Sequence, residues 1–220
     1  MSNFKTLGIV SRVILFLFAA ALSGTLLAPA AHADLIYSFT YDGCSNGCGP
    51  QDSFGTVNLS QVNPTTVDIS VSLLDGNKFV STGSHTGFAF NFVGGNVNVG
   101  ELPDGWSDAG AKIAEAGLGM FSHGITCDAG NSNDKRGCAG SNPWAGALEF
   151  QVSRATGLSV TDFQINGGGY TFAADILSGT NGKTGLVAAG VADVSEPSTL
   201  VLLGSGLVSL AGMLSNKFRG

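Results

Sequence analysis

The chain has 220 residues, of which 44% are hydrophobic, only 12% are charged and 33 are glycine. This length fits one good-sized domain, and the high hydrophobic and low charged fractions exclude a chain that is disordered throughout. All 16 acidic residues lie between Asp34 and Glu196, together with only six of the ten basic residues. This middle part therefore has a net charge of about −10, which excludes the phosphate backbone of nucleic acid as a partner.

The first 33 residues have the pattern of a secretory signal peptide. Two basic residues precede an apolar run over positions 13–28, and Ala31 and Ala33 supply the small side chains of a cleavage site. This order predicts cleavage after Ala33, which makes Asp34 the first residue of the mature protein. The alternative is an uncleaved anchor helix. Either way, the sequence predicts export through the inner membrane.

Period-two alternation of apolar with small or polar residues predicts a series of short strands after the signal. The alternation is clearest at 35–41, 67–73, 88–92 and 148–152, and further candidates are 54–60, 96–99, 158–163, 170–175 and 185–191. Turn-forming stretches rich in Gly, Asn, Asp and Pro separate these runs. Eight or nine such strands predict an all-β fold over residues 34–193, an antiparallel β-sandwich that is jelly-roll-like in strand count. The terminal segments 1–33 and 194–220 are expected to form a signal helix and a transmembrane sorting helix.

Two segments between the strands have other patterns. Residues 107–117 combine Ala, Lys, Ile and Glu and predict a short helix, with Ser107 as its N-cap. Residues 119–146 are expected to form a long irregular loop that leaves the sandwich and is partly held by cysteines.

Four cysteines in an exported chain are expected to be oxidised. Three pairings are formally possible, and the short spacings favour the local one, Cys44 with Cys48 and Cys127 with Cys138. A zinc site that includes His123 is the alternative, but the oxidising compartment favours disulfides over thiolate ligands.

The sequence predicts no catalytic residues. Residues 43–47 match the Gly-x-Ser-x-Gly pattern of a nucleophile elbow, but loop sequence follows them where that mechanism needs a helix. His85 and His123 have no partner at a recognisable spacing and are expected to be ordinary hydrogen-bonded residues.

The polar stretch 128–134 is a weak candidate for calcium. Its side chains offer the oxygen ligands that Ca²⁺ prefers, at Asp128, Asn131, Asn133 and Asp134, but it lacks the spacing and the terminal Glu of an EF-hand. A solvated loop is the alternative. No metal or other cofactor is expected, with calcium as the one exception to test.

Trp106 and Trp144 lie in loops rich in Gly and Pro, where exposed aromatic rings often stack on sugars or pack against partners. They are therefore possible ligand-binding residues. The alternative is that both rings close the ends of the sandwich.

The last 26 or so residues contain a second signal. Ser195, Glu196, Pro197, Ser198 and Thr199 lead into an apolar run that ends at Leu214. Lys217 and Arg219 follow as a basic tail. At 1.5 Å per residue, this run only approaches the roughly 30 Å of hydrocarbon in a bilayer, which suits a transient anchor.

This tail resembles the PEP-CTERM sorting signal of polysaccharide-producing Gram-negative bacteria, a segment also known as an ice-binding protein C-terminal domain. It differs from the family pattern at Ser195, where the family has Pro, and in its two basic residues, where the family has a cluster of Arg. The resemblance implies recognition by an exosortase-type processing enzyme and a transient stay in the inner membrane. Basic residues after the apolar run place the C-terminus in the cytoplasm and the domain outside.

These features together predict a surface or extracellular-matrix protein without catalytic activity, with exopolysaccharide as a possible partner. The alternatives are a carbohydrate-binding β-sandwich, with calcium as a candidate aid to binding, and a secreted hydrolase whose site is assembled from distant residues.

Overall fold

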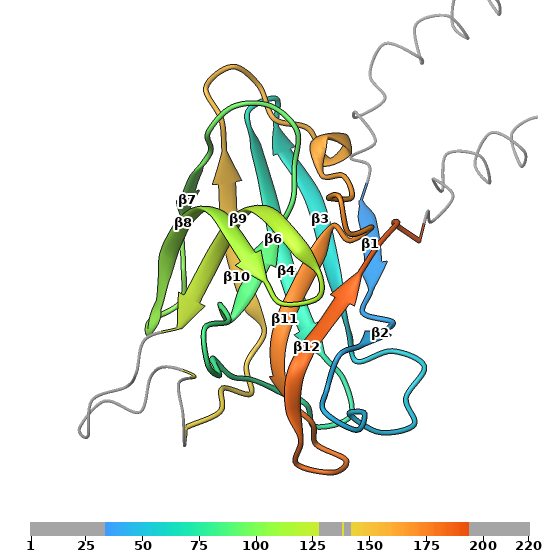
Figure 1. Cartoon of the computed structure of the whole chain (residues 1–220). Helices are drawn as coiled ribbons and strands as arrows, with labels where there is room; N and C mark the ends of the chain where they lie inside the picture. Colours follow the sequence, from blue (N-terminus) through green and yellow to red (C-terminus); the bar gives the residue numbers. More distant parts are fainter. Residues whose placement is uncertain (1–33, 128–137, 139–141, 194–220) are drawn as a thin grey trace, which may run out of the picture. The chain divides into compact units, whose positions relative to one another are not determined.

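A computed structural model describes residues 34–127, 138 and 142–193 of the chain, and all of them belong to one compact unit. This part consists of two antiparallel β-sheets and one turn of 3-10 helix (Figure 1). The predicted all-β fold and the β-sandwich architecture are thereby confirmed. The strands are β1 (Leu35–Ser38), β2 (Tyr41–Asp42), β3 (Gly55–Asn63), β4 (Thr66–Leu73), β5 (Lys78–Phe79), β6 (Phe88–Phe90), β7 (Asn98–Gly100), β8 (Trp106–Glu115), β9 (Gly119–Cys127), β10 (Leu148–Ser153), β11 (Phe172–Leu177) and β12 (Thr184–Ala189), and the 3-10 turn is η2 (Val160–Asp162).

The first sheet has the order β1-β3-β4-β10-β7, and the second has the order β2-β12-β11-β6-β9-β8, with β5 paired to β11. The chain therefore changes sheet repeatedly, for example between β1 and β2 and between β4 and β5. Strands far apart in sequence become neighbours, such as β4 and β10, whose register pairs Ile69 with Phe150.

The main core fills the space between the sheets. Alternate residues of each strand point inward, and their rings pack edge to face or offset, as Phe88 does against Phe150 and Phe172. Such aromatic pairs add to the stability that burial of apolar area provides.

A second, smaller core lies on the outer face of the second sheet. Phe172 and Ala174 of β11 point into the main core, whereas Ala173 between them belongs to this second cluster together with Leu118 and Phe121. The β8–β9 hairpin carries Leu118 and Phe121, and in Figure 1 it passes in front of β6 and β11. The hairpin therefore buries part of a sheet face that would otherwise be exposed to solvent.

Most predicted strands are found near their expected positions. The runs 35–41, 54–60, 67–73, 88–92, 96–99, 148–152, 170–175 and 185–191 coincide with or overlap β1 and β2, β3, β4, β6, β7, β10, β11 and β12. The prediction at 158–163 was wrong, because Val160–Asp162 forms η2. Ser159 caps this turn, and Ser159 and Asp162 form a reciprocal capping box. The Ser-x-x-Asp spacing is the signal that the apolar alternation concealed.

The predicted helix at 107–117 was also wrong, because this segment is strand β8, which pairs with β9 from Trp106 to Glu115. Gly110 and Lys112 have positive φ angles, 86° and 64°, which a right-handed helix does not allow. The helix-favouring residue types are overruled by tertiary contacts, since Trp106 and Glu115 at the two ends of the strand are both buried.

The predicted loop at 119–146 was wrong in its first part, because Gly119–Cys127 forms β9. The calcium candidates Asp128, Asn131, Asn133 and Asp134 lie outside the described residues. So do the signal segment, with Ala31 and Ala33, and the sorting segment, with Ser195 to Thr199, Lys217 and Arg219. Among the described residues, no helix is long and apolar enough to cross a membrane.

Candidate functional site

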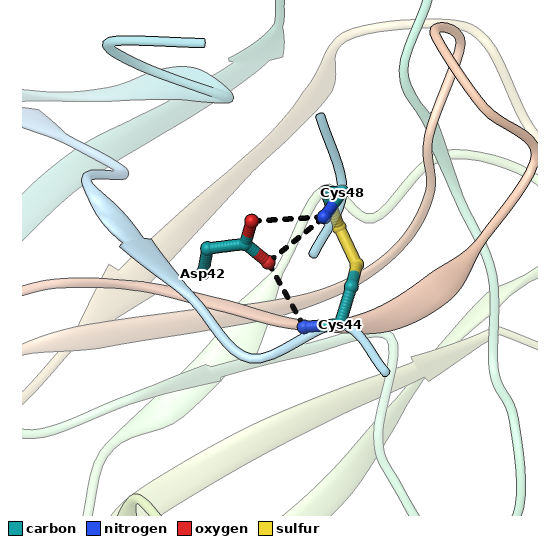
Figure 2. A group of neighbouring side chains, drawn as sticks. All are labelled: Asp42, Cys44 and Cys48. Carbon is teal, nitrogen blue, oxygen red and sulfur yellow. Dashed lines mark hydrogen bonds between the residues drawn. A yellow bond between two sulfur atoms is a disulfide. The ribbon is translucent and has the colours of Figure 1, made fainter. Parts of the chain in front are cut away.

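The first disulfide closes a small loop around the carboxylate of Asp42 at the end of β2. Cys44 is bonded to Cys48, as the sequence predicted. The Asp42 carboxylate accepts hydrogen bonds from the backbone N–H groups of Cys44, at 3.0 Å, and of Cys48, at 2.8 and 3.1 Å (Figure 2). The covalent bond and the carboxylate thus hold both ends of the loop in place.

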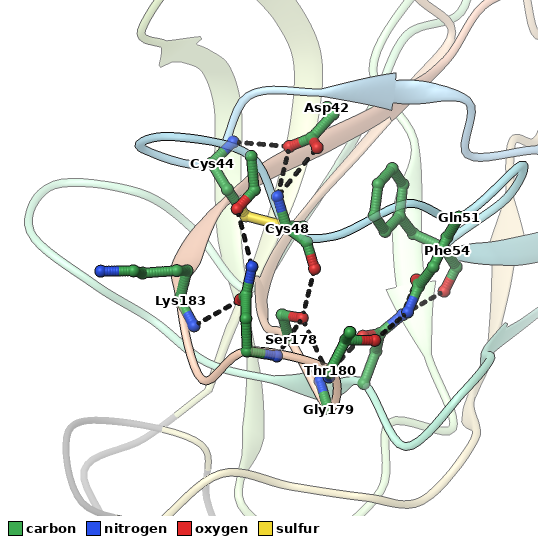
Figure 3. The surroundings of a disulfide bond; sticks show 12 residues. Asp42, Cys44, Cys48, Gln51, Phe54, Ser178, Gly179, Thr180 and Lys183 are labelled. Carbon is green, nitrogen blue, oxygen red and sulfur yellow. Dashed lines mark hydrogen bonds between the residues drawn. A yellow bond between two sulfur atoms is a disulfide. The ribbon is translucent and has the colours of Figure 1, made fainter.

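The β11–β12 turn supports this loop from the other side. The Ser178 hydroxyl donates to the carbonyl of Cys48 (Figure 3). The Asn181 amide donates to the carbonyl of Gly47. Gln51 donates to the Thr180 hydroxyl at 2.6 Å. The loop is therefore anchored to the second sheet through side-chain hydrogen bonds.

Asp42, Cys44 and Cys48 form the one cluster in the described part whose ligand atoms lie close enough together to hold a metal ion. Both sulfur atoms are in the disulfide, and the carboxylate oxygens already accept backbone hydrogen bonds. A disulfide sulfur is not a thiolate ligand, so the chemistry of this cluster does not suit a metal.

Ser45 lies at the exposed tip of this loop. Asn46 and Gly47 after it have positive φ angles, 65° and 79°, and the chain closes a turn there instead of starting a helix. The Gly-x-Ser-x-Gly match therefore lacks the strand-turn-helix geometry of a nucleophile elbow. Within the described residues, no hydrogen bond joins Ser45 to a histidine.

A pocket of about 270 Å³ lies beside the loop, and His85 contributes to its wall. Tyr41, Ser45, Thr82 and Thr184 are among the other lining residues. Nδ1 of His85 is 2.8 Å from Oε2 of Glu115, so Nε2 is the ring nitrogen that remains for a molecule in the pocket.

Glu115, at the end of β8, is the buried partner that orients His85. Only 3% of Glu115 is exposed, and its second oxygen, Oε1, accepts hydrogen bonds from the Thr86 backbone N–H at 3.0 Å and the Thr86 hydroxyl at 2.6 Å. A carboxylate that is buried and fully hydrogen-bonded fixes the imidazole ring in position. The sequence did not indicate this pair, because 30 residues separate its members.

Asp175 of β11 is a second buried carboxyl group in the same region. It is 0% exposed, and Oδ2 accepts hydrogen bonds from the Thr82 backbone N–H and hydroxyl at 2.6 and 2.7 Å. In the described part of the chain, Oδ1 is buried without a hydrogen-bond partner. Burial is the main cause that raises the pKa of Asp175 above 3.8. The nearby Glu115 also raises it, whereas the Thr82 hydrogen bonds and His85 oppose the shift.

His123 is placed differently. Its ring packs against Phe90, with centroids 5.4 Å apart, and Nε2 lies 2.6 Å from Oδ1 of Asp108, whose side chain is 42% exposed. This is a hydrogen-bonded histidine at the edge of the core, and no pocket of those described here includes it.

Tyr41 and Tyr170 lie together on the outer face of the second sheet, near the His85 pocket. Their ring centroids are 5.1 Å apart, and Tyr41 is the only aromatic side chain among the exposed large hydrophobic residues of the described part. Burial, followed by the charge of Tyr41, raises the pKa of the Tyr170 phenol above its usual value. Tyr170 lines a second pocket of about 460 Å³.

A third pocket, of about 640 Å³, lies over the first sheet. Its floor consists of polar side chains in two rows across β3, β4 and β10, namely Asn58, Ser70 and Glu149, and Ser60, Asp68 and Gln151. Alternation of polar and apolar residues on these strands explains this outer face. Phe150 also lines the pocket, but it is only 3% exposed and packs in the main core.

The two tryptophans lie together at one end of the sandwich. Trp106 is only 6% exposed, its ring centroid is 5.3 Å from that of Trp144, and both rings contact Phe79. These contacts match the alternative in which the rings close the end of the sandwich. The second disulfide, Cys127–Cys138, is formed as predicted, and both of its cysteines belong to the main core.

No family model, no curated protein and no solved structure matches this chain.

Proposed function

We propose that this chain is an exported protein without catalytic activity, displayed at the cell surface or in the extracellular matrix. Its signal segment would direct it through the inner membrane, where the PEP-CTERM-like tail would hold it until an exosortase-type enzyme processes the tail. The mature domain would then remain at the envelope, where exopolysaccharide is a candidate partner.

The observation that carries this proposal is the pairing of all four cysteines in two disulfides. Disulfides persist outside the cytoplasm and are rare within it. Both bridges stabilise loops of the sandwich. Among the described residues, the Gly-x-Ser-x-Gly match does not have the geometry of a nucleophile elbow. The chain's frequent change of sheet also supports the jelly-roll-like topology that we propose for the domain.

The tail can be tested by replacing Glu196 and Pro197 together with Ala in the producing bacterium. The proposal predicts that the variant stays in the inner-membrane fraction, whereas the wild-type protein reaches the surface. A replacement of Val191 by Ala, at an exposed position ahead of the sorting segment, is the control and should be sorted normally. Equal surface levels of the Glu196/Pro197 variant and the wild-type protein would contradict the role of the tail.

The secreted-hydrolase alternative would centre on the His85–Glu115 pair, because a histidine held by a buried carboxylate has the arrangement of a general base. Loss of a measured hydrolytic activity in a His85→Ala variant would favour that alternative. The lack of a hydrogen bond between Ser45 and a histidine in the described part is the reason that we place the hydrolase third, after the surface role and the carbohydrate-binding alternative.

A further inference from the structure

Two pockets flank the Tyr41–Tyr170 pair on the outer face of the second sheet. Tyr41 lines the pocket that contains His85, Tyr170 lines the other pocket, and the rings are 5.1 Å apart. The pair therefore stands where the two pockets meet. A ligand long enough to occupy both would have to pass across the two rings.

Strand β12 and Gly190, the residue that follows it, line both pockets. Thr184 and Leu186 line the first pocket, and Ala188 and Gly190 line the second. These residues alternate along the strand, so they share its outward face. The stretch from Thr184 to Gly190 spans about 20 Å at about 3.3 Å per residue, which is long enough for a short oligosaccharide.

Small residues keep this part of the surface low. At Gly190 a Cβ atom would lie 3.0 Å from the carbonyl oxygen of Gly169. The backbone approaches so closely at this position that a larger side chain would not fit without a shift. Ala188 is also small, and it lies beside Tyr41 in the register between β12 and β2.

Polar groups lie at the two ends of the surface. The first pocket offers His85, Ser45 and Thr82, and the second offers Thr40, Asp52 and Ser53. Histidine, hydroxyl and carboxylate groups together can both donate hydrogen bonds to sugar hydroxyls and accept them. Aromatic side chains between such polar groups are a usual arrangement for an amphipathic ligand in a concave site.

We infer that this surface binds a neutral polysaccharide, whose sugar rings contact Tyr41 and Tyr170 and whose hydroxyl groups bond to the polar residues of the two pockets. Between Asp34 and Glu196 the chain has 16 acidic and six basic residues, so an anionic polysaccharide would be repelled. Phe150, the aromatic residue that lines the polar pocket over the first sheet, is only 3% exposed, and Trp106 is buried as well. Tyr41 and Tyr170 therefore take the role that the sequence suggested for Trp106 and Trp144.

The inference goes beyond the proposed surface role and does not depend on tail processing. The full chain, recovered from the producing cells in mild detergent, can be tested by affinity gel electrophoresis. Gels would contain soluble β-1,3-glucan, dextran, mannan or, as the anionic probe, alginate. We expect at least one neutral polysaccharide to retard the wild-type protein, alginate to leave its mobility unchanged, and Tyr41→Ala and Tyr170→Ala each to weaken binding about tenfold.

Two controls separate a lost contact from a damaged fold. Tyr41→Phe keeps the ring and should retain most of the binding, and Val62→Ala changes an exposed residue of the other sheet and should bind as the wild type does. The Ala variants should also keep the wild-type melting temperature within a few degrees. Failure of all neutral polysaccharides to retard the wild-type protein would overturn the inference, and so would equal retardation of the wild-type protein and both Ala variants. Neither result would alter where the protein is sorted.

Discussion

Glu115 and Asp175 show how two carboxyl groups are buried in the same region with different consequences. Both oxygens of Glu115 have partners, in His85 and Thr86, whereas Oδ1 of Asp175 has none in the described part. Burial without full hydrogen bonding disfavours a charged carboxylate at Asp175, so the two residues should respond differently to substitution.

Glu115→Ala should lower the free energy of unfolding by about 3 kcal/mol, because it leaves His85 and Thr86 without their buried partner. Asp108→Ala is the matched control, since Asp108 also pairs with a histidine but is 42% exposed. That variant should lose about 1 kcal/mol or less. Urea unfolding of both variants measures the difference, and equal losses would show that the Glu115 contacts add nothing specific.

Asp175 should make stability depend on pH. Its pKa in the folded protein is raised above 3.8, so between the two pKa values the native state binds more protons than the unfolded state. Stability from this group is therefore fully present below the unfolded pKa and is lost as pH rises through the folded pKa. Asp175→Asn does not ionise, so its stability relative to wild type should increase from about pH 4 towards neutral pH. Urea titrations over that range test this, and a constant or decreasing difference would contradict it.

The sequence indicated little about which individual residues form the candidate surface. Neither the Tyr41–Tyr170 pair nor the His85–Glu115 pair has a spacing that points to a site, because each joins residues from different strands and loops. The cysteine pairing was predictable, since short loops in an exported chain favour local bridges.

The β8–β9 hairpin is the element for which the predictions from sequence were least accurate. Residue types alone favoured a helix at 107–117, and the register shift between Asp108 and Gly110 is set by pairing with β9 and not by local preference. Strands such as β4 and β10 were predictable because one face of each is buried, which imposes alternation. The second, smaller core under the hairpin was not predictable, because it depends on which strands Leu118 and Phe121 pack against.

Lys112 provides a test of this irregular strand. Its φ of 64° is costly for a residue with a Cβ atom, so Lys112→Gly should raise the free energy of unfolding by about 1 kcal/mol. The neighbouring Ala111→Gly is the control. It relieves no positive φ and should lower stability by about 0.5–1 kcal/mol through the greater freedom of the unfolded chain. Thermal unfolding of both variants tests the opposite signs, and a loss in both would indicate that Lys112 is not strained.

The two disulfides act on the whole molecule by restricting its unfolded state. They close loops with sequence separations of 4 and 11 residues. In the chain-entropy estimate, the longer loop contributes about 3 kcal/mol and the shorter one about 2 kcal/mol. The double variant Cys127→Ser/Cys138→Ser should therefore lose more stability than Cys44→Ser/Cys48→Ser in urea unfolding. The reverse order would show that the Asp42 loop matters more than loop length.

The central claim, an exported protein that is oxidised and sorted through its tail, is tested most directly by mass spectrometry of the protein recovered from the cell surface without reduction. We expect a chain that begins at Asp34, contains the bridges Cys44–Cys48 and Cys127–Cys138, and has lost its C-terminal apolar segment. Surface protein that retains an intact Arg219-Gly220 terminus, or that has four free thiols, would contradict it.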